Sequence, residues 1–250
     1  MTAARFVPPQ LATLVDQVPV GAGWTFEVKY DGYRLEALVS GREVSLQTRR
    51  AKDWTARFPA IAAGLATLKV KDAVLDGEIV VLDAAGRSVF SLLQQSLEGT
   101  RRIQPMYFVF DLLHLEGRDL RELSLADRRV QLEKLLRRLR GAARSSIRVA
   151  QRLPGEGPKL LRAACRQVLE GGIAKQLDAP YTSGRGRGWL KIKCGRRQEF
   201  VVIGFTPPRG SRTGIGSLLL GVYHRDALRY AGRVGSGFDT ETLQRLKARL

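Results

Sequence analysis

The stretch from Trp24 to Asp31 alternates strictly between apolar and polar side chains. A period of two residues is typical of a β-strand, because successive side chains point to opposite faces of a sheet. Glu27, Lys29 and Asp31 therefore share one face of the predicted strand. The glycine after Asp31 predicts a turn into a second alternating run, Tyr33 to Val39. The pattern places a lysine between two carboxylates, beside a glycine that lets another group come close.

A lysine on a strand is more often a solvated surface charge than a nucleophile. The Lys29-x-Asp31-Gly32 pattern occurs by chance in roughly one chain of this length in twenty, given average residue usage. A solvated lysine is therefore the alternative against which the rest of the sequence has to be weighed.

The overall charge points to a polyanionic partner. Lysine and arginine outnumber acidic residues 42 to 24 in a chain of 250 residues, which gives a formal charge of +18. Neutralising phosphates and releasing their counterions would favour nucleic acid. The alternatives are a solubilising surface charge or a proteome rich in arginine. With 44% hydrophobic residues, the chain can form an ordinary packed core in one large or two smaller domains.

Cysteine and histidine are scarce. The cysteines are Cys165 and Cys194, without a Cys-x-x-Cys pair, and the histidines are His114 and His224. This argues against a zinc site and against a disulfide scaffold. No apolar run approaches the roughly 18 residues of a membrane span, and the N-terminus lacks a signal-peptide pattern. We expect a cytoplasmic protein without a membrane partner.

The remaining pattern predicts a mixed α/β fold. Residues 1–23 are expected to be irregular, because proline and glycine pairs interrupt them. Further strands are predicted at Val44–Arg49, Val74–Asp83, Tyr107–Leu113, Gly172–Lys175 and Trp189–Lys193. Helices are predicted around Trp54–Leu65, from Ser124 to Leu139, and at residues 159–169. The polar side of the second helix carries Arg128, Arg129, Lys134, Arg137 and Arg138, and solvent exposure is favoured over DNA contact for it.

The last part of the chain has a different sequence pattern. Residues 183–188 form a basic, glycine-rich stretch that is either a loop following a phosphate backbone or a solvated connector. After residues 194–198, short β-like runs are predicted at Phe200–Phe205, Ser217–Tyr223 and Leu228–Arg233, separated by loops rich in glycine and proline. This pattern predicts a small all-β barrel that follows a hinge.

Charged residues interrupt the predicted strands at eight positions: Glu27, Lys29, Glu78, Asp111, Glu170, Lys175, Lys191 and Lys193. One such charge is ordinary at a half-exposed strand end. Eight of them, mixing acids and lysines, indicate a polar cavity between sheets in which charges are paired or hold a metal. The sequence has no Gly-x-x-x-x-Gly-Lys-Ser/Thr segment, so a nucleotide would have to be bound in another way.

Five ordered motifs resemble a known superfamily. Lys29 to Arg34 resembles the nucleophile motif of covalent nucleotidyltransferases, which include ATP-dependent DNA ligases, RNA ligases and mRNA capping enzymes. The later motifs are similar to Asp76–Glu78, Phe110–Leu113, Glu170–Lys175 and Trp189–Lys193, in the same order. The residue sequences of Leu177–Tyr181 and Gly232–Phe238 resemble the ligase module of bacterial end-joining DNA ligases.

The resemblance implies a fold and its division. It implies an α/β (α+β) nucleotidyltransferase domain, ATP-grasp-like with antiparallel sheets, at residues 1–194, which would be the adenylation domain. A partial OB-fold β-barrel, incomplete at its C-terminal side, would follow at residues 195–250. Relatives carry a final basic motif that engages the ATP pyrophosphate, and the sequence ends before such a motif. We therefore leave open whether the chain adenylates itself.

The resemblance also implies the chemistry. Lys29 would attack the α-phosphate of ATP and become a lysine–AMP adduct, which passes AMP to the 5′-phosphate of a nick before the 3′-hydroxyl seals it. A lysine of ordinary pKa, near 10.4, is neutral only about 0.04% of the time at pH 7, so it needs activation. Lys191, Lys193 and a bound Mg²⁺ (or Mn²⁺) would supply that activation and neutralise phosphate charge.

The same resemblance assigns roles to the other residues. Glu27 would lie by the adenine and Phe110 would stack on it, whereas Arg34 and Glu78 would hold the ribose. Arg49 would lie near the ribose and a DNA phosphate. Phosphate contacts would come from Lys175, Lys191 and Lys193, and metal-binding carboxylates from Glu170, Glu78 and Asp111. Simple core packing for Phe110 and a turn cap for Asp111 are the alternatives.

The sequence therefore predicts an ATP-dependent DNA ligase that seals nicks and breaks in DNA repair by end joining. The alternatives are an RNA ligase, a GTP-dependent capping-type nucleotidyltransferase, or a truncated, non-catalytic DNA-binding fragment. The expected partners are double-stranded DNA with nicks or ends, a Ku-type end-binding protein, and polymerase or nuclease modules. The expected location is the bacterial cytoplasm, in association with the nucleoid.

Overall fold

The computed structural model describes residues 4–101, 103–153, 157, 165, 170–194, 199–208, 210 and 213–250. The chain divides into two compact units, Met1–Cys194 and Gly195–Leu250, each with a hydrophobic core of its own. The helix predicted at residues 159–169 lies almost entirely outside the described residues.

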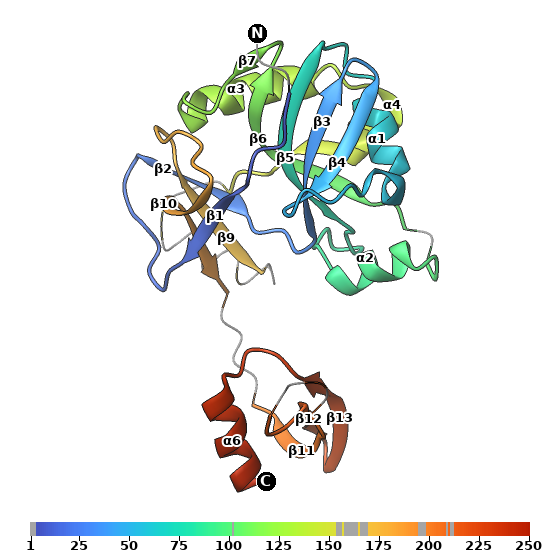
Figure 1. The fold of residues 1–250 in the computed structure, drawn as a ribbon, viewed down its shortest axis with the longest axis vertical. Coiled ribbons are helices and arrows are strands. Elements are labelled where there is room, and N and C mark those ends of the chain that lie inside the picture. Colours follow the sequence, from blue (N-terminus) through green and yellow to red (C-terminus); the bar gives the residue numbers. More distant parts are fainter. Residues whose placement is uncertain are drawn as a thin grey trace. The chain divides into compact units, whose positions relative to one another are not determined.

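The larger unit contains a six-stranded sheet (Figure 1). Its strands run in the order β4 (Glu43–Thr48), β3 (Tyr33–Ser40), β5 (Asp72–Val80), β6 (Met106–Leu115) and β7 (Arg118–Asp119), with β8 (Ile147–Val149) also paired to β6. Neighbours are antiparallel except for the parallel pair of β6 and β8. The strands predicted in this part of the chain are confirmed to within a few residues at each end.

Helices pack against one face of this sheet and form the main core. They are α1 (Pro59–Leu65), α2 (Phe90–Leu97), α3 (Leu125–Leu136) and α4 (Gly141–Ser146), with a 3₁₀ turn, η1 (Thr55–Arg57). Alternate residues of β3, such as Leu35 and Ala37, meet Leu132 and Leu135 of α3 in one buried cluster. The helix α3 begins as predicted, because the Ser124 side chain caps it by accepting a hydrogen bond from the third following backbone N–H.

A second sheet of four strands completes the larger unit. Its order is β1 (Gln10–Leu14), β10 (Gly184–Lys193), β9 (Gly171–Gln176) and β2 (Trp24–Val28). The pair of β1 and β10 is parallel, and the other two pairs are antiparallel. The two sheets pack together through a cluster of Val74, Leu113, Tyr181 and Trp189. The face of the six-stranded sheet that the helices do not cover therefore lies opposite β2, β9 and β10.

Two sequence predictions about irregular segments are wrong. The segment 1–23 contains strand β1, and Gly184–Gly188, predicted as a loop or connector, forms the first half of strand β10. Each segment supplies the other's hydrogen-bonding partner, since Gln10 pairs with Gly184 across the parallel ladder. A partner more than 170 residues away in the chain leaves no local periodicity, so the sequence pattern could not reveal either strand.

The turn at Gly32 joins two sheets rather than two paired strands. Strand β2 belongs to the four-stranded sheet and β3 to the six-stranded one. A Cβ atom on Gly32 would stand only 2.0 Å from the carbonyl oxygen of Ile79. Glycine is therefore required where the chain crosses between the layers.

A disulfide bond is present, contrary to the expectation from the scarce cysteines. Cys165 and Cys194 form it, although 29 residues separate them in sequence. Cys194 also lies beside Glu170, to whose carbonyl it donates its backbone N–H at 3.0 Å, where β10 pairs with β9.

The smaller unit contains the predicted short strands. They are β11 (Val201–Thr206), β12 (Ser217–His224) and β13 (Ala227–Val234), which form an antiparallel sheet. Helix α6 (Thr240–Arg249) was not predicted; Asp239 caps it, and its Leu243 packs with Ile215 and Leu218. In the part of the chain that the structure describes, no helix is both long and apolar enough to cross a membrane.

We predict that Gly77→Ala destabilises the larger unit. A Cβ atom there would stand 2.5 Å from Cε2 of the Tyr107 ring and 2.7 Å from the Phe108 carbonyl oxygen. Overpacking of this kind costs about 1–3 kcal/mol of unfolding free energy, measurable by urea denaturation. The matched control is Gly186→Ala in β10, where no atom lies within 4 Å of the added carbon. Equal destabilisation of the two variants would contradict the assignment of close packing.

Candidate active site

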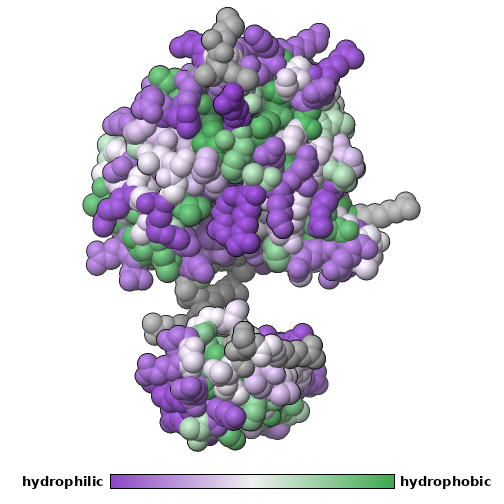
Figure 2. Space-filling view, in the orientation of Figure 1, coloured by the Kyte–Doolittle hydropathy of each residue, from purple (hydrophilic) through white to green (hydrophobic). Residues whose placement is uncertain are grey.

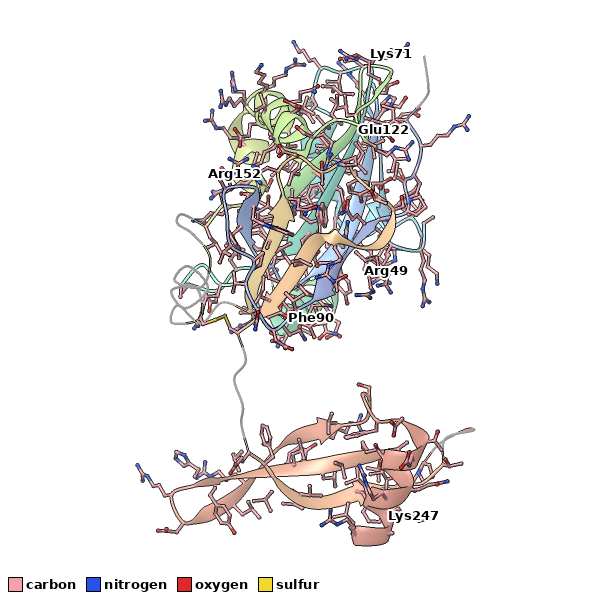
Figure 3. The ribbon with its side chains drawn as sticks, turned by 90° about the vertical axis from the view of Figure 1, so that its left-hand side faces the viewer. Arg49, Lys71, Phe90, Glu122, Arg152 and Lys247 are labelled. Carbon is pink, nitrogen blue, oxygen red and sulfur yellow. A yellow bond between two sulfur atoms is a disulfide. The ribbon has the colours of Figure 1, made fainter. Side chains whose placement is uncertain are left out.

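A pocket of about 390 Å³ opens between the two sheets. Charged and aromatic side chains from both sheets line it: Glu27, Lys29, Tyr30, Arg34, Arg49, Glu78, Phe110, Lys175, Trp189 and Lys191, with Ala12, Val28 and Ile173. Arg49, which follows β4, is labelled in Figure 3. The structure thus brings together most of the residues that the sequence singled out, although they are spread over more than 160 positions.

Lys29 lies just beyond the end of β2. Its backbone N–H donates to the carbonyl of Gly171 at 3.1 Å, which fixes the chain beside β9. Its ammonium forms an ion pair with Oε1 of Glu170. The lysine side chain is 18% exposed, so it is neither free in solvent nor buried in the core. The other oxygen of Glu170, Oε2, is buried without a hydrogen-bond partner among the described residues.

Glu27 is the most heavily paired acid of the pocket. Its side chain is 2% exposed, and Oε2 pairs with the ammonium of Lys175 at 2.8 Å. Its Oε1 pairs with the guanidinium of Arg129 from helix α3. Arg129 also donates to the carbonyl of Ala150, at 2.5 Å. Both carboxylate oxygens are therefore engaged by cations, which offsets the cost of burying the charges.

Lys175 is enclosed by aromatic rings as well as by Glu27. Its ammonium lies 4.5 Å from the ring centroid of Phe110 and 4.1 Å from that of Trp189. Burial lowers the pKa of Lys175, while the Glu27 carboxylate opposes that shift. Phe110 itself packs edge-on against Trp189, at 5.7 Å between centroids, so it belongs both to the core and to the pocket wall.

Arg34 is held by a second carboxylate. Asp76 accepts from its Nε at 2.9 Å and from its Nη2 at 2.6 Å, and the Tyr181 hydroxyl donates to the same carboxylate at 2.7 Å. Sequence reasoning assigned no role to Asp76 or Tyr181. The sequence feature that could have identified them is their position in motifs recognised by resemblance: Asp76 lies in Asp76–Glu78 and Tyr181 in Leu177–Tyr181.

Glu78 has an altered acidity. Burial raises its pKa to about 8, with nearby Asp76 adding to the shift and Arg34 opposing it. The carboxyl is therefore largely neutral at pH 7 and can donate a hydrogen bond as well as accept one. Binding a cation would require this group to lose its proton.

Lys191 and Lys193 share one face of β10, as the alternation predicted, but only Lys191 lines the pocket. Lys193 is exposed at the end of the strand. Desolvation, followed by the charges of Arg185, Lys193 and Lys29, lowers the pKa of Lys191. Positive charge around the pocket thus makes it easier for this amine to lose its proton.

Asp111 does not reach the pocket. It is fully buried, and both of its oxygens accept from Arg128, at 2.8 Å from Nε and 3.0 Å from Nη2. The predicted solvated face of α3 is wrong for Arg128 and Arg129, which are buried. Each arginine finds a carboxylate from another element, Asp111 or Glu27, and such partners are invisible to helical periodicity.

Few side chains around the pocket suit a divalent metal. Among the residues that the structure describes, no group of three or more His, Cys, Asp or Glu side chains is placed to hold a metal ion. The unpartnered Oε2 of Glu170 is a feature that fits a cation. Mg²⁺ is commonly held by one or two carboxylates together with substrate phosphates, so Glu170 suits such a site. Asp111 does not, because Arg128 occupies it.

The chain matches known proteins in both sequence and structure. The model of the ATP dependent DNA ligase domain matches residues 4–193, and that of the ATP dependent DNA ligase C terminal region matches residues 211–250. The multifunctional non-homologous end joining protein LigD of Pseudomonas aeruginosa is 45% identical over 249 residues, or 98% of this chain and 29% of that protein. The LigD protein of Mycobacterium tuberculosis is 39% identical over 229 residues, covering 91% of this chain and 29% of that protein.

Solved structures agree with these matches. The structure of mycobacterial DNA ligase D complexed with ATP and MES has a TM-score of 0.67 and 36% sequence identity, and the match covers 97% of this chain and 76% of that chain. The chain spans about 29% of the length of the two curated relatives.

We predict that Arg128→Met destabilises the protein by about 3–5 kcal/mol, because it leaves the buried Asp111 charge without its partner. Urea denaturation measures the change in unfolding free energy. The matched control is Arg138→Met, an exposed arginine of the same basic stretch, for which we expect a change within about 0.5 kcal/mol. Similar values for the two variants would mean that Arg128 is not a structural residue.

We predict that Glu36, a buried carboxyl on β3, makes the stability of the protein depend on pH. Val7 donates its backbone N–H to Oε1 at 2.8 Å, Oε2 has no partner among the described residues, and burial raises the pKa of Glu36 to about 8. A raised pKa in the folded state favours folding at low pH, and this contribution is lost as the pH rises toward 8, at up to about 1.4 kcal/mol per pH unit.

The neutral variant Glu36→Gln should therefore flatten the dependence of unfolding free energy on pH between about 5 and 8. It should also be more stable than the unmodified protein at pH 8.5, where the unmodified protein has to bury a charged carboxylate. Chemical denaturation at several pH values measures both effects. Glu43→Gln, at an exposed position of the neighbouring strand, is the control; a pH profile that Glu36→Gln leaves unchanged would refute the prediction.

Proposed function

The chain belongs to the ATP-dependent DNA ligase family, and we propose that it seals DNA strand breaks through a covalent lysine–AMP intermediate on Lys29. The observation that carries this proposal is the position of the Lys29 ammonium, paired with Glu170 in a pocket that four other cations, Arg34, Arg49, Lys175 and Lys191, also line. A pocket of about 390 Å³ is large enough for a nucleotide, and Arg49 and Lys191, which no buried carboxylate holds among the described residues, suit its phosphates.

In the first step, Nζ of Lys29 attacks the α-phosphorus of ATP. A P–N bond forms, and the P–O bond to pyrophosphate breaks. The proton on Nζ passes to Oε1 of Glu170, with which the ammonium is already paired. Lys191 lies on the same pocket wall, and its charge when protonated stabilises the oxygens of the reacting phosphate.

The base and sugar of ATP occupy the other end of the pocket. We place the adenine against Phe110 and beside Glu27, which both line the pocket. Because both Glu27 oxygens are already bound by cations, its carboxylate supports this wall rather than serving as a free acceptor. Glu78, which is largely neutral at pH 7, can donate a hydrogen bond to a ribose oxygen while Arg34 lies next to it.

The metal proposed for this reaction is Mg²⁺ (or Mn²⁺), held by Glu170 and the substrate phosphates, with Glu78 as a second ligand only once it has lost its proton. Such an ion, when bound, neutralises charge on the phosphates. We do not retain Asp111 as a ligand, because both of its oxygens are used by Arg128.

The later steps transfer AMP and close the strand. The 5′-phosphate at the break attacks the AMP phosphorus, and Lys29 leaves as an amine. The 3′-hydroxyl then attacks the adenylated phosphate and expels AMP, which forms the phosphodiester bond. Arg49, which lines the pocket, is our candidate for contact with the DNA phosphate. Lys193 would contact the same backbone from the exposed end of β10.

We propose the wider context in the same terms. Residues 1–194 would form an ATP-grasp-like adenylation domain and residues 195–250 part of an OB-fold barrel. The similarity to LigD proteins, named for non-homologous end joining, supports a role in double-strand break repair in the bacterial nucleoid. A Ku-type end-binding protein and polymerase or nuclease modules would be its partners.

We predict that Lys29→Ala abolishes covalent labelling of the protein by ATP that carries a radioactive α-phosphate. Removal of the nucleophile should lower labelling at least about a thousandfold. The control is Lys69→Ala, at an exposed lysine outside the pocket lining, which should label normally. Labelling with GTP in place of ATP would favour the capping-type alternative.

A nick that already carries AMP separates loading from sealing. Sealing of the adenylated nick without labelling by ATP would show an intact sealing site and a defective first step. If the protein neither acquires a label nor closes that nick, it is the non-catalytic DNA-binding fragment and the proposal is wrong.

A further inference from the structure

The larger unit has a second cavity, which is larger than the nucleotide pocket. It is an open groove of about 760 Å³ between the end of α3, helix α4 and the segment that begins with β8. Five arginines and a single acid are among its lining residues: Arg129, Arg137, Arg144, Arg148, Arg152 and Glu133. We call this surface the arginine groove. Hydrophilic side chains cover much of the face of this unit seen in Figure 2, but a groove with this excess of one charge is a more specific feature.

The acid in the groove is already neutralised. Glu133 pairs with Arg129 at 3.3 Å and approaches Arg137 at 4.0 Å. Arg129, in turn, is buried against Glu27 and the carbonyl of Ala150. This leaves the three exposed arginines Arg144, Arg148 and Arg152, for which no carboxylate partner occurs among the residues that the structure describes.

Unpaired like charges that line one groove repel one another, and an anion that binds there relieves the repulsion. A guanidinium presents paired donors that match two phosphate oxygens, and it remains charged at any physiological pH. Arg148 is already oriented, because its Nε donates to the carbonyl of Ser145 at 3.0 Å. These are properties of a phosphate-binding surface rather than of a small-molecule site.

The groove adjoins the nucleotide pocket through a shared wall. The backbone N–H of Val28 in β2 donates to the carbonyl of Gln151 at 3.2 Å, and the backbone N–H of Gln151 donates to the Tyr30 hydroxyl at 3.3 Å. Arg152, labelled in Figure 3, forms a backbone bridge with Glu27. The segment that carries Arg148 and Arg152 therefore has the pocket on one side and the groove on the other.

We propose that the arginine groove binds the sugar–phosphate backbone of the DNA substrate at a distance from the break. The groove is a contact additional to Arg49 and Lys193 and holds the larger unit on DNA without reading sequence. This proposal rests on the proposed function, because it takes DNA to be the substrate. It adds that residues outside every recognised motif supply part of the affinity.

The test is the triple substitution Arg144→Gln, Arg148→Gln and Arg152→Gln. The matched control, Arg101→Gln, Arg118→Gln and Arg138→Gln, removes the same charge from exposed positions outside the groove. Binding of a fluorescent nicked duplex is measured for both at several salt concentrations. We expect the groove variant to bind at least about tenfold more weakly than the control near physiological salt. The slope of log affinity against log salt should fall by about 0.9 for each DNA phosphate that the variant no longer neutralises.

Covalent labelling by ATP, measured in parallel, separates this proposal from the proposed function. Normal labelling of both variants with weak DNA binding by the groove variant supports the groove. Equal DNA binding by the two variants overturns it, including the case in which the groove serves an acidic protein instead. If the unmodified protein takes no label and leaves an adenylated nick open, the proposed function fails. If the triple variant melts at a lower temperature than its control, the single variant Arg144→Gln, at an exposed side chain, is tested in its place. Weaker DNA binding by that variant then supports the groove, and unchanged DNA binding overturns it.

Discussion

The buried carboxylate of Glu27 is the interaction on which the site depends. It lies between Arg129 of α3 and Lys175 of β9, and all three side chains are at most 4% exposed. Burying one of these charges alone would be costly, so removing a single partner is expected to damage the fold more than an ordinary surface change. Because the three residues come from β2, β9 and the helix layer, the cluster fastens the four-stranded sheet to the rest of the unit and fixes the back wall of the pocket.

The same pairing divides the positive charges of the protein into two groups. Arg34, Arg128, Arg129 and Lys175 are each held by a specific carboxylate and serve the architecture of the site. Arg144, Arg148 and Arg152 of the arginine groove have no such partner among the described residues, and they are available to phosphates. A high net charge therefore does not by itself mark a residue that contacts DNA phosphates.

Much of the site was predictable because its residues stand in five ordered motifs that resemble those of covalent nucleotidyltransferases. Lys29 and Lys191 lie in alternating runs, whose period indicates the face of each side chain, and Glu78 interrupts an apolar run; the structure brings all three to one pocket. Asp111 belongs to a similar run, yet it turns to Arg128 on the helix side. Alternation predicts the face of the sheet on which a side chain lies. A register shift between β5 and β6 near Asp76 changes the face for the residues beside it, and no short sequence pattern predicts such a shift.

The sequence by itself determined the position of most strands along the chain with their charged residues, the turn at Gly32, the start of α3 at Ser124 and the change to short β-runs after residue 194, because periodicity, turns and caps are local properties. Only the tertiary structure decided that β1 pairs with the first half of β10, that Cys165 reaches Cys194, and which carboxylate each buried arginine meets. Those outcomes depend on the free energy of pairing groups that are distant in the chain, and this free energy leaves no periodic trace in the sequence.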